Sequence, residues 1–262
     1  MHVWYFAYGS NMNPKSLEGR RRVYPAHSLP AQLDGYVLSF GLQGLPYLEP
    51  GFGTIEEMPL ASSGGPLPSR AVCGVVHCIT PTEWLGVQAT EGVGSTRVGY
   101  QLIEVLVHLT DGRAVKALTL KAAALSLMKD SRHVLPSLRY LRLIQEGALF
   151  HSINPEYMAY LNAHPFFTLN PGWKARAGKL AIIGLFFTMF SPVMWVFALQ
   201  KLRAWASMFL ATYGITLASH SKATVWQAYY GYGIFKTAWW LHDHVLQPLF
   251  GPGCCYKDSK DD

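Results

Sequence analysis

Charged residues are scarce in this chain. Only 15% of its 262 residues are charged, although 50% are hydrophobic, whereas an ordinary soluble domain has roughly 25% charged residues. The net charge at pH 7 is +6, and the densest group of like charges is the three arginines at 20–22. A nucleic-acid interface needs a concentrated basic surface that matches the phosphates. We therefore expect no nucleic-acid partner.

Cysteines are also few. The chain has 4 cysteines, at positions 73, 78, 254 and 255, too few to form a disulfide framework at this length. Cys73 and Cys78 lie in an apolar run, where cysteine behaves as a small buried hydrophobic residue. The opening residues lack the basic segment and cleavage site of a signal peptide. These features predict a reducing compartment, with the N-terminal part of the protein in the cytoplasm.

Acidic residues are absent between Glu156 and Asp243. The composition changes near Asn170-Pro171-Gly172, which is itself a turn sequence, so we predict a domain at 1–168 and a hydrophobic helical tail at 169–262. Within the tail, 180–199 is uncharged and flanked by lysine and arginine. Its length of about twenty residues matches a bilayer core. We expect membrane attachment through this stretch, and the alternative is a helix packed on the domain.

The first 168 residues alternate between short apolar runs and turns. The pattern predicts strands at 3–8, 35–40, 71–77, 101–108 and 113–119, the last two joined by Thr-Asp-Gly as in a hairpin. Helices are expected to begin after Thr80, Ser137 and Asn154, where capping residues stand, with Pro81 at a first helical position. Strands outnumber helices, which predicts an α+β fold with a largely antiparallel sheet.

Two segments carry residues suited to chemistry. An aromatic strand runs through Tyr5, Phe6, Ala7 and Tyr8 directly into Gly9-Ser10-Asn11, and backbone N–H groups at such a strand end can converge on an anion. Glu91 stands among small and apolar residues, with Arg97 its nearest cation in sequence. Burial without a cationic partner raises the pKa of a carboxyl group toward neutrality, as a general acid/base requires.

The order and detail of these segments resemble the γ-glutamylcyclotransferase family and its AIG2-like relatives. The opening Tyr-Phe-Ala-Tyr-Gly-Ser-Asn-Met is similar to the family signature, and Glu91-Gly92-Val93 followed by Tyr100 is similar to the segment that holds its catalytic glutamate. Pro136-Ser137 with Tyr140 resembles the helical part that follows. The resemblance covers about residues 1–165 and leaves out the hydrophobic tail.

The resemblance implies a mixed, largely antiparallel β-barrel with flanking helices. It implies an enzyme that cyclises a γ-glutamyl group to 5-oxoproline and releases the amine or amino acid, with Glu91 as the general acid/base. The substrate would be bound by Tyr5, Phe6, Ala7, Tyr8, Gly9, Ser10, Asn11, Tyr100 and Leu120. Several relatives carry a tyrosine at the position of Leu120, so the substrate preference departs from theirs. We expect no metal and no organic cofactor.

Two alternatives remain open at this point. The same chemistry could act on a glutathione-derived adduct in secondary metabolism, which an apolar Leu120 would suit. Alternatively, the chain could be a non-catalytic binding module of this fold, tethered to a membrane by its tail. For either enzymatic function the partner is a small γ-glutamyl compound. The sequence is compatible with a monomer or a homodimer.

Overall fold

The computed structural model describes residues 2–58, 71–91, 93, 97–128, 134–189, 191 and 223–251. These residues form two compact units. The first contains the described residues of Met1–Gly44 and Leu48–Thr168, and the second contains Leu45–Tyr47 with the described residues of Leu169–Gly253.

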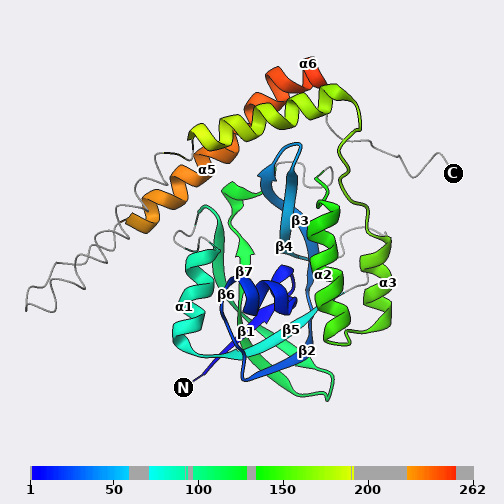
Figure 1. Ribbon diagram of the computed structural model, residues 1–262. Helices are drawn as coiled ribbons and strands as arrows, with labels where there is room; N and C mark the ends of the chain where they lie inside the picture. Colours follow the sequence, from blue (N-terminus) through cyan, green and yellow to red (C-terminus); the bar gives the residue numbers. More distant parts are fainter. Residues whose placement is uncertain are drawn as a thin grey trace, which may run out of the picture. The chain divides into compact units, whose positions relative to one another are not determined.

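The first unit is built on a closed five-stranded barrel with the strand order β1-β5-β2-β6-β7 (Figure 1). Its strands are β1 (Val3–Ala7), β2 (His27–Leu33), β5 (Val72–Ile79), β6 (Tyr100–Leu109) and β7 (Ala114–Ala122). Neighbouring strands are antiparallel, except that β1 closes the barrel against β7 in parallel, with Tyr5 opposite Leu118. The prediction of a mixed, largely antiparallel barrel is therefore confirmed.

Strand β2 is the barrel strand that the sequence pattern did not predict. It contains Pro30, and proline is normally confined to positions where a strand lacks a partner on one side. Here β2 pairs with β5 along its whole length but with β6 only through Ala31 and Gln32. Pro30 lies opposite Val75 of β5, at a position where β2 has no partner on the side toward β6.

Two further strands, β3 (Tyr36–Leu45) and β4 (Glu49–Glu57), form a separate two-stranded sheet. Strand β4 reaches the barrel through Thr54, whose hydroxyl accepts a hydrogen bond of 2.9 Å from the backbone N–H of Ala122. This contact is buried. It brings the middle of β4 beside the end of β7, close to the residues of the candidate site.

The helices begin where the capping residues predict. Helix α1 (Pro81–Thr90) has a capping box: the Thr80 hydroxyl accepts from the N–H of Glu83, and the Glu83 carboxylate accepts from the N–H of Thr80. Satisfying these donors at the first turn is typical of stable helix starts. Helices α2 (Leu138–Phe150) and α3 (Pro155–Ala163) begin at Ser137 and Asn154 in the same way, with side-chain oxygens accepting backbone N–H groups.

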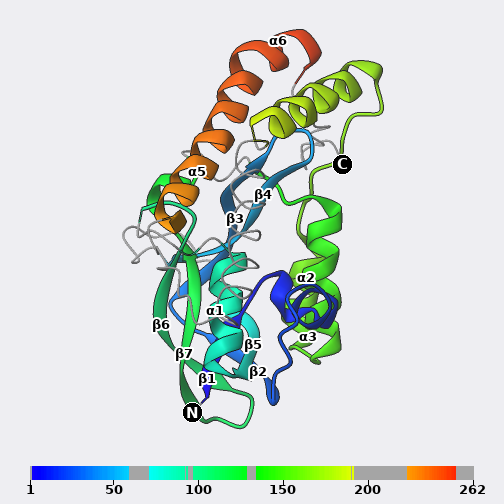
Figure 2. The same ribbon diagram turned by 60° about the vertical axis from the view of Figure 1, so that its left-hand side comes forward.

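Helix α2 packs closely on the segment that follows β1. This segment contains the 3-10 turn η1 (Ser10–Met12) and the π-helical η2 (Lys15–Arg20). A Cβ added to Gly147 of α2 would lie 2.7 Å from the backbone nitrogen of Asn13, so only glycine permits this approach. Figures 1 and 2 show α2 and α3 side by side, while α1 lies on a different side of the barrel.

Most of the described residues of the second unit after Thr168 are helical. Residues 173–189 are helical, and α5 (Ala223–Leu241), η5 (His242–Leu246) and α6 (Gln247–Phe250) follow later in the chain. Among the described residues, no helix combines the length and the apolar character that crossing a membrane requires. The stretch 180–199, for which we predicted membrane attachment, lies partly outside the described residues.

Candidate active site

The turn after β1 places Asn11 inside the first unit. Strand β1 ends at Ala7, and Ser10–Met12 then close a 3-10 turn in which the N–H of Met12 donates to the carbonyl of Gly9 at 3.1 Å. Asn11 is 5% exposed. The first N–H groups of such a turn have no partner within it, so the turn both buries a polar side chain and leaves backbone donors near Gly9.

Glu91 is the residue that ends helix α1. Its backbone N–H donates to the carbonyl of Val87 at 3.0 Å, and its side chain is 17% exposed. A carboxylate at the C-terminus of a helix lies at the negative end of the helix dipole, where negative charge is disfavoured. The charge of Glu91 therefore needs hydrogen-bond donors or a cation nearby.

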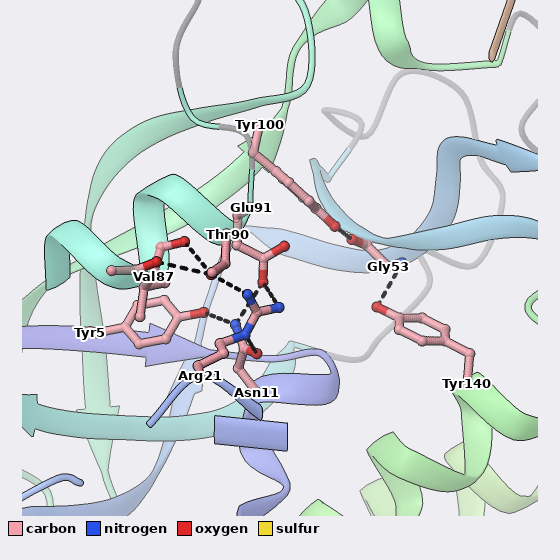
Figure 3. Close-up of polar contacts among 10 residues, drawn as sticks. Tyr5, Asn11, Arg21, Gly53, Val87, Thr90, Glu91, Tyr100 and Tyr140 are labelled. Carbon is pink, nitrogen blue, oxygen red and sulfur yellow. Dashed lines mark hydrogen bonds and ion pairs between the residues drawn. The ribbon is translucent and has the colours of Figure 1, made fainter. Parts of the chain in front are cut away.

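The structure supplies one such donor from the motif loop, the segment Tyr8-Gly9-Ser10-Asn11. The Nδ2 group of Asn11 donates to Oε1 of Glu91 at 2.9 Å and to the hydroxyl of Tyr5 at 2.8 Å. Tyr5 lies on β1, Asn11 on η1 and Glu91 at the end of α1, eighty positions after Asn11, and Figure 3 shows the three side chains gathered at one place. Three of the predicted site residues thus come together.

A cation also faces Glu91, contrary to the expectation from the sequence. The Nη2 atom of Arg21 lies 2.6 Å from Oε1 of Glu91, so the premise of a carboxylate without a cationic partner is wrong. Arg21 follows η2, seventy positions before Glu91 in the chain, and sequence distance did not reveal the contact. The sequence feature that could have pointed to this cation is the arginine triplet at 20–22. In the structure Arg20 and Arg22 are exposed, whereas Arg21 is partly buried.

A second group of polar contacts lies beside the first. The hydroxyl of Tyr100 donates to the carbonyl of Gly53 at 2.6 Å, and the N–H of Gly53 donates to the hydroxyl of Tyr140 at 3.1 Å. A Cβ added to Gly9 would lie 3.3 Å from the same Tyr140 hydroxyl. Tyr140 of α2 is therefore bonded to β4, as Figure 3 shows, and its hydroxyl also lies beside Gly9.

Four tyrosine hydroxyls share this environment and remain protonated. Burial, together with the nearby Glu91 carboxylate, raises the pKa of Tyr140 to about 12. Burial is the main cause that raises the pKa values of Tyr5, Tyr8 and Tyr100 well above their usual range, and the surrounding tyrosines and the Glu91 carboxylate add to it. At physiological pH these side chains are neutral phenols, which can donate or accept hydrogen bonds but cannot act as bases.

The other predicted site residues have different environments. Phe6 and Ala7 are buried in the barrel wall, 0% and 2% exposed. The Tyr8 hydroxyl donates to the backbone carbonyl of Leu120, whose own side chain is 4% exposed. Ser10 is half-buried in the 3-10 turn. Of the predicted set, Tyr5, Asn11 and Glu91 form the direct network, and the sequence reasoning did not assign a site role to Arg21, Thr90 or Tyr140.

A cavity of about 210 Å³ lies elsewhere in the first unit. Residues of η2, β2, β5 and α2 line it, among them His77 and His151, and Glu91 does not. Within the described parts of the chain, no three histidine, cysteine, aspartate or glutamate side chains are grouped as a metal site requires.

Comparison with known proteins agrees with this fold. No protein-family model matches the chain. It is 30% identical over 125 residues to the γ-glutamyl cyclotransferase verK of Clonostachys rogersoniana, covering 44% of this chain and 68% of that protein. It is 27% identical over 263 residues to the γ-glutamyl cyclotransferase aclK of Aspergillus oryzae, covering 96% and 89%.

Solved structures share the fold. An uncharacterized human protein superposes with a TM-score of 0.51 at 24% identity, covering 65% of this chain and 92% of that one. A γ-glutamyl cyclotransferase superposes with a TM-score of 0.50 at 24% identity, covering 66% and 92%. The chain therefore has a γ-glutamylcyclotransferase-like fold. By its sequence relatives, the chain belongs to the γ-glutamyl cyclotransferase family.

Proposed function

We propose that this protein cyclises the γ-glutamyl group of a small γ-glutamyl compound, forming 5-oxoproline and releasing the amino acid or amine. The observation that carries the proposal is the part-buried hydrogen bond from Asn11 of the motif loop to Glu91, with the same Asn11 amide also bound to the Tyr5 hydroxyl of β1, in a member of this family. A non-catalytic module has no need to hold a carboxylate in this way, at the unfavourable end of a helix.

The reaction needs one proton shuttle. The substrate's own α-amine attacks its γ-carbonyl carbon, a new C–N bond closes the five-membered ring, and the C–N bond to the leaving nitrogen breaks. Glu91 would take a proton from the α-ammonium and later deliver one to the leaving nitrogen, two transfers in opposite directions that a single carboxyl group can perform. Because the reaction is unimolecular, holding the amine against the carbonyl supplies much of the rate.

Stabilising the tetrahedral intermediate requires donors near the γ-carbonyl oxygen. The N–H groups at the start of the Ser10–Met12 turn lie next to Gly9, and so does the Tyr140 hydroxyl. That hydroxyl accepts from Gly53 and stays protonated because burial raises the pKa of Tyr140 to about 12. Its own proton can therefore be donated to the developing oxyanion.

A second substrate class is suggested by one residue. Leu120 is buried and apolar, at the position where the family resemblance leads us to expect a tyrosine in several relatives. Losing that hydroxyl favours a larger, less polar leaving group, as in a glutathione-derived adduct. The reaction at the γ-glutamyl group would be the same for both substrate classes.

The function is tested by incubating the purified protein with γ-glutamyl amino acids, glutathione and glutathione S-conjugates, and quantifying 5-oxoproline. We expect release from at least one of them. Tyr140→Phe should lower kcat by about 10-fold or more, since removing one oxyanion donor costs up to 10²–10³-fold, whereas the matched Tyr24→Phe, at an exposed tyrosine (64%), should not. No 5-oxoproline from any compound would end the proposal.

We further propose that residues 1–168 are the catalytic domain. All the contacts of the site come from residues of the first unit. We also propose that the tail at 169–262 attaches the protein to a membrane.

A further inference from the structure

Arg21 makes three different contacts at the candidate site. Its Nε group donates to Oδ1 of Asn11 at 2.7 Å, its Nη1 group donates to the hydroxyl of Thr90, and its Nη2 group pairs with Oε1 of Glu91 at 2.6 Å. The guanidinium thus binds the motif loop and the end of α1 at the same time (Figure 3). The guanidinium presents its donors on three rigidly spaced nitrogens, whereas an ammonium group has all its donors on one nitrogen.

The contact with Asn11 decides the orientation of an amide. Arg21 has only N–H donors, so the Asn11 atom facing it must be the carbonyl oxygen. The Asn11 NH₂ group then faces the other way, and both of its hydrogens are used, one on Glu91 and one on Tyr5. Without Arg21, the amide could turn and present its oxygen to the Glu91 carboxylate, which would be repulsive.

The contact with Glu91 decides which carboxylate oxygen is occupied. Both Arg21 and Asn11 bind Oε1. The second oxygen points away from the guanidinium, toward the side where Tyr100 and Tyr140 lie (Figure 3). Holding one oxygen from two directions fixes the carboxyl plane and leaves the other oxygen for a substrate amine.

The third effect of Arg21 is electrostatic. Glu91 ends α1, where the helix dipole disfavours a negative charge. A guanidinium at this end of the helix interacts favourably with both the carboxylate and the last turn, whose residue Thr90 it also contacts. Both side chains are 17% exposed, so water screens the pair less than it would at the surface.

We propose that Arg21 is the positioning residue of this site: it fixes Glu91 through Oε1, orients Asn11, and leaves Oε2 of Glu91 as the proton-transferring atom. This inference rests on the proposed function for its kinetic meaning. Arg21 itself does not need to touch the substrate.

The test uses the full chain and the γ-glutamyl compound from which it releases 5-oxoproline fastest. Arg21→Ala should lower kcat by about 30-fold or more while KM changes by less than about threefold, because the lost interaction acts on the chemical step and not on substrate binding. Millimolar guanidinium chloride should restore at least about tenfold of the lost rate. Guanidinium should not restore the rate of Glu91→Gln. The matched control Arg20→Ala, at an exposed neighbouring arginine, should have the kcat of the wild type.

Arg21→Lys separates charge from geometry. It keeps the charge, but its single nitrogen cannot occupy the three separate positions of Nε, Nη1 and Nη2, so its kcat should fall between those of the wild type and Arg21→Ala. An Arg21→Ala variant that keeps kcat within about threefold of the wild type would overturn the inference. So would a loss that appears only in KM and that guanidinium does not recover.

A readout without activity distinguishes this inference from the proposed function. If the wild type releases no 5-oxoproline, the melting temperatures of Arg21→Gln, Glu91→Gln and the double variant still measure the pair. We expect the double variant to lose clearly less than the sum of the single losses, since contacting residues are not additive. Additive losses would refute the positioning role whatever the catalytic result.

Discussion

Glu91→Gln is the substitution that tests the site most directly. Glutamine has nearly the same shape, and its carbonyl oxygen can still accept from Asn11 and Arg21, which bind Oε1 of Glu91 at 2.9 and 2.6 Å. The geometry of the site is therefore kept, while the negative charge and the capacity to carry a proton are lost. We expect kcat to fall by at least about 10²-fold, corresponding to about 2.7 kcal/mol of transition-state stabilisation, with KM little changed.

The same substitution leaves Arg21 without its counter-charge. Breaking a fully buried pair costs about 3–5 kcal/mol, and because both side chains are 17% exposed we expect a smaller loss, about 1–2 kcal/mol. For a protein of this size the melting temperature should drop by roughly 2–8 °C. Circular dichroism and 5-oxoproline release, measured on the same preparation, separate the catalytic loss from unfolding.

Glu104→Gln is the matched control. Glu104 is an exposed carboxylate that lies 3.5 Å from Lys116, and exposed pairs contribute about 0–1 kcal/mol. Its kcat should equal that of the wild type. A Glu91→Gln variant that is folded and retains kcat within about threefold of the wild type would refute the proton-shuttle mechanism.

Three further predictions concern other parts of the chain. Gly9→Ala places a Cβ 3.3 Å from the Tyr140 hydroxyl, so it should lower kcat while leaving the melting temperature within a few degrees. Gly86→Ala is the matched control, because a Cβ added there meets only open space, and it should keep full activity. Equal activities of the two variants would contradict the role of the motif loop. Burial lowers the pKa of His77 to about 3, so at acid pH the unfolded chain binds a proton that the folded chain does not. The free energy of unfolding should therefore fall by up to about 1.4 kcal/mol per pH unit as the pH drops below 6.5. An equally steep fall for His77→Gln, measured by urea unfolding, would exclude this cause. Residues 1–168 alone should be soluble and active while the full chain sediments with membranes, and a full chain that stays in the supernatant after ultracentrifugation would contradict the membrane attachment.

The sequence determined most of the local structure. Capping residues and the proline at a first helical position predicted the starts of α1, α2 and α3, because these signals act within a few residues. Strand runs were predicted close to β1, β3, β5, β6 and β7 for the same reason. Strand β2 was missed because Pro30 conceals a strand whose side toward β6 is unpaired there.

The sequence also indicated Tyr5, Asn11 and Glu91, through their resemblance to a family pattern, but not how they are held. Only the tertiary structure decided that Arg21 pairs with Glu91 and that Tyr140 lies beside Gly9. The physical reason is that closing the barrel and packing α2 on the loop bring together groups that no local pattern relates. A carboxylate that appears to have no partner along the chain can therefore have a cation in direct contact once the chain is folded.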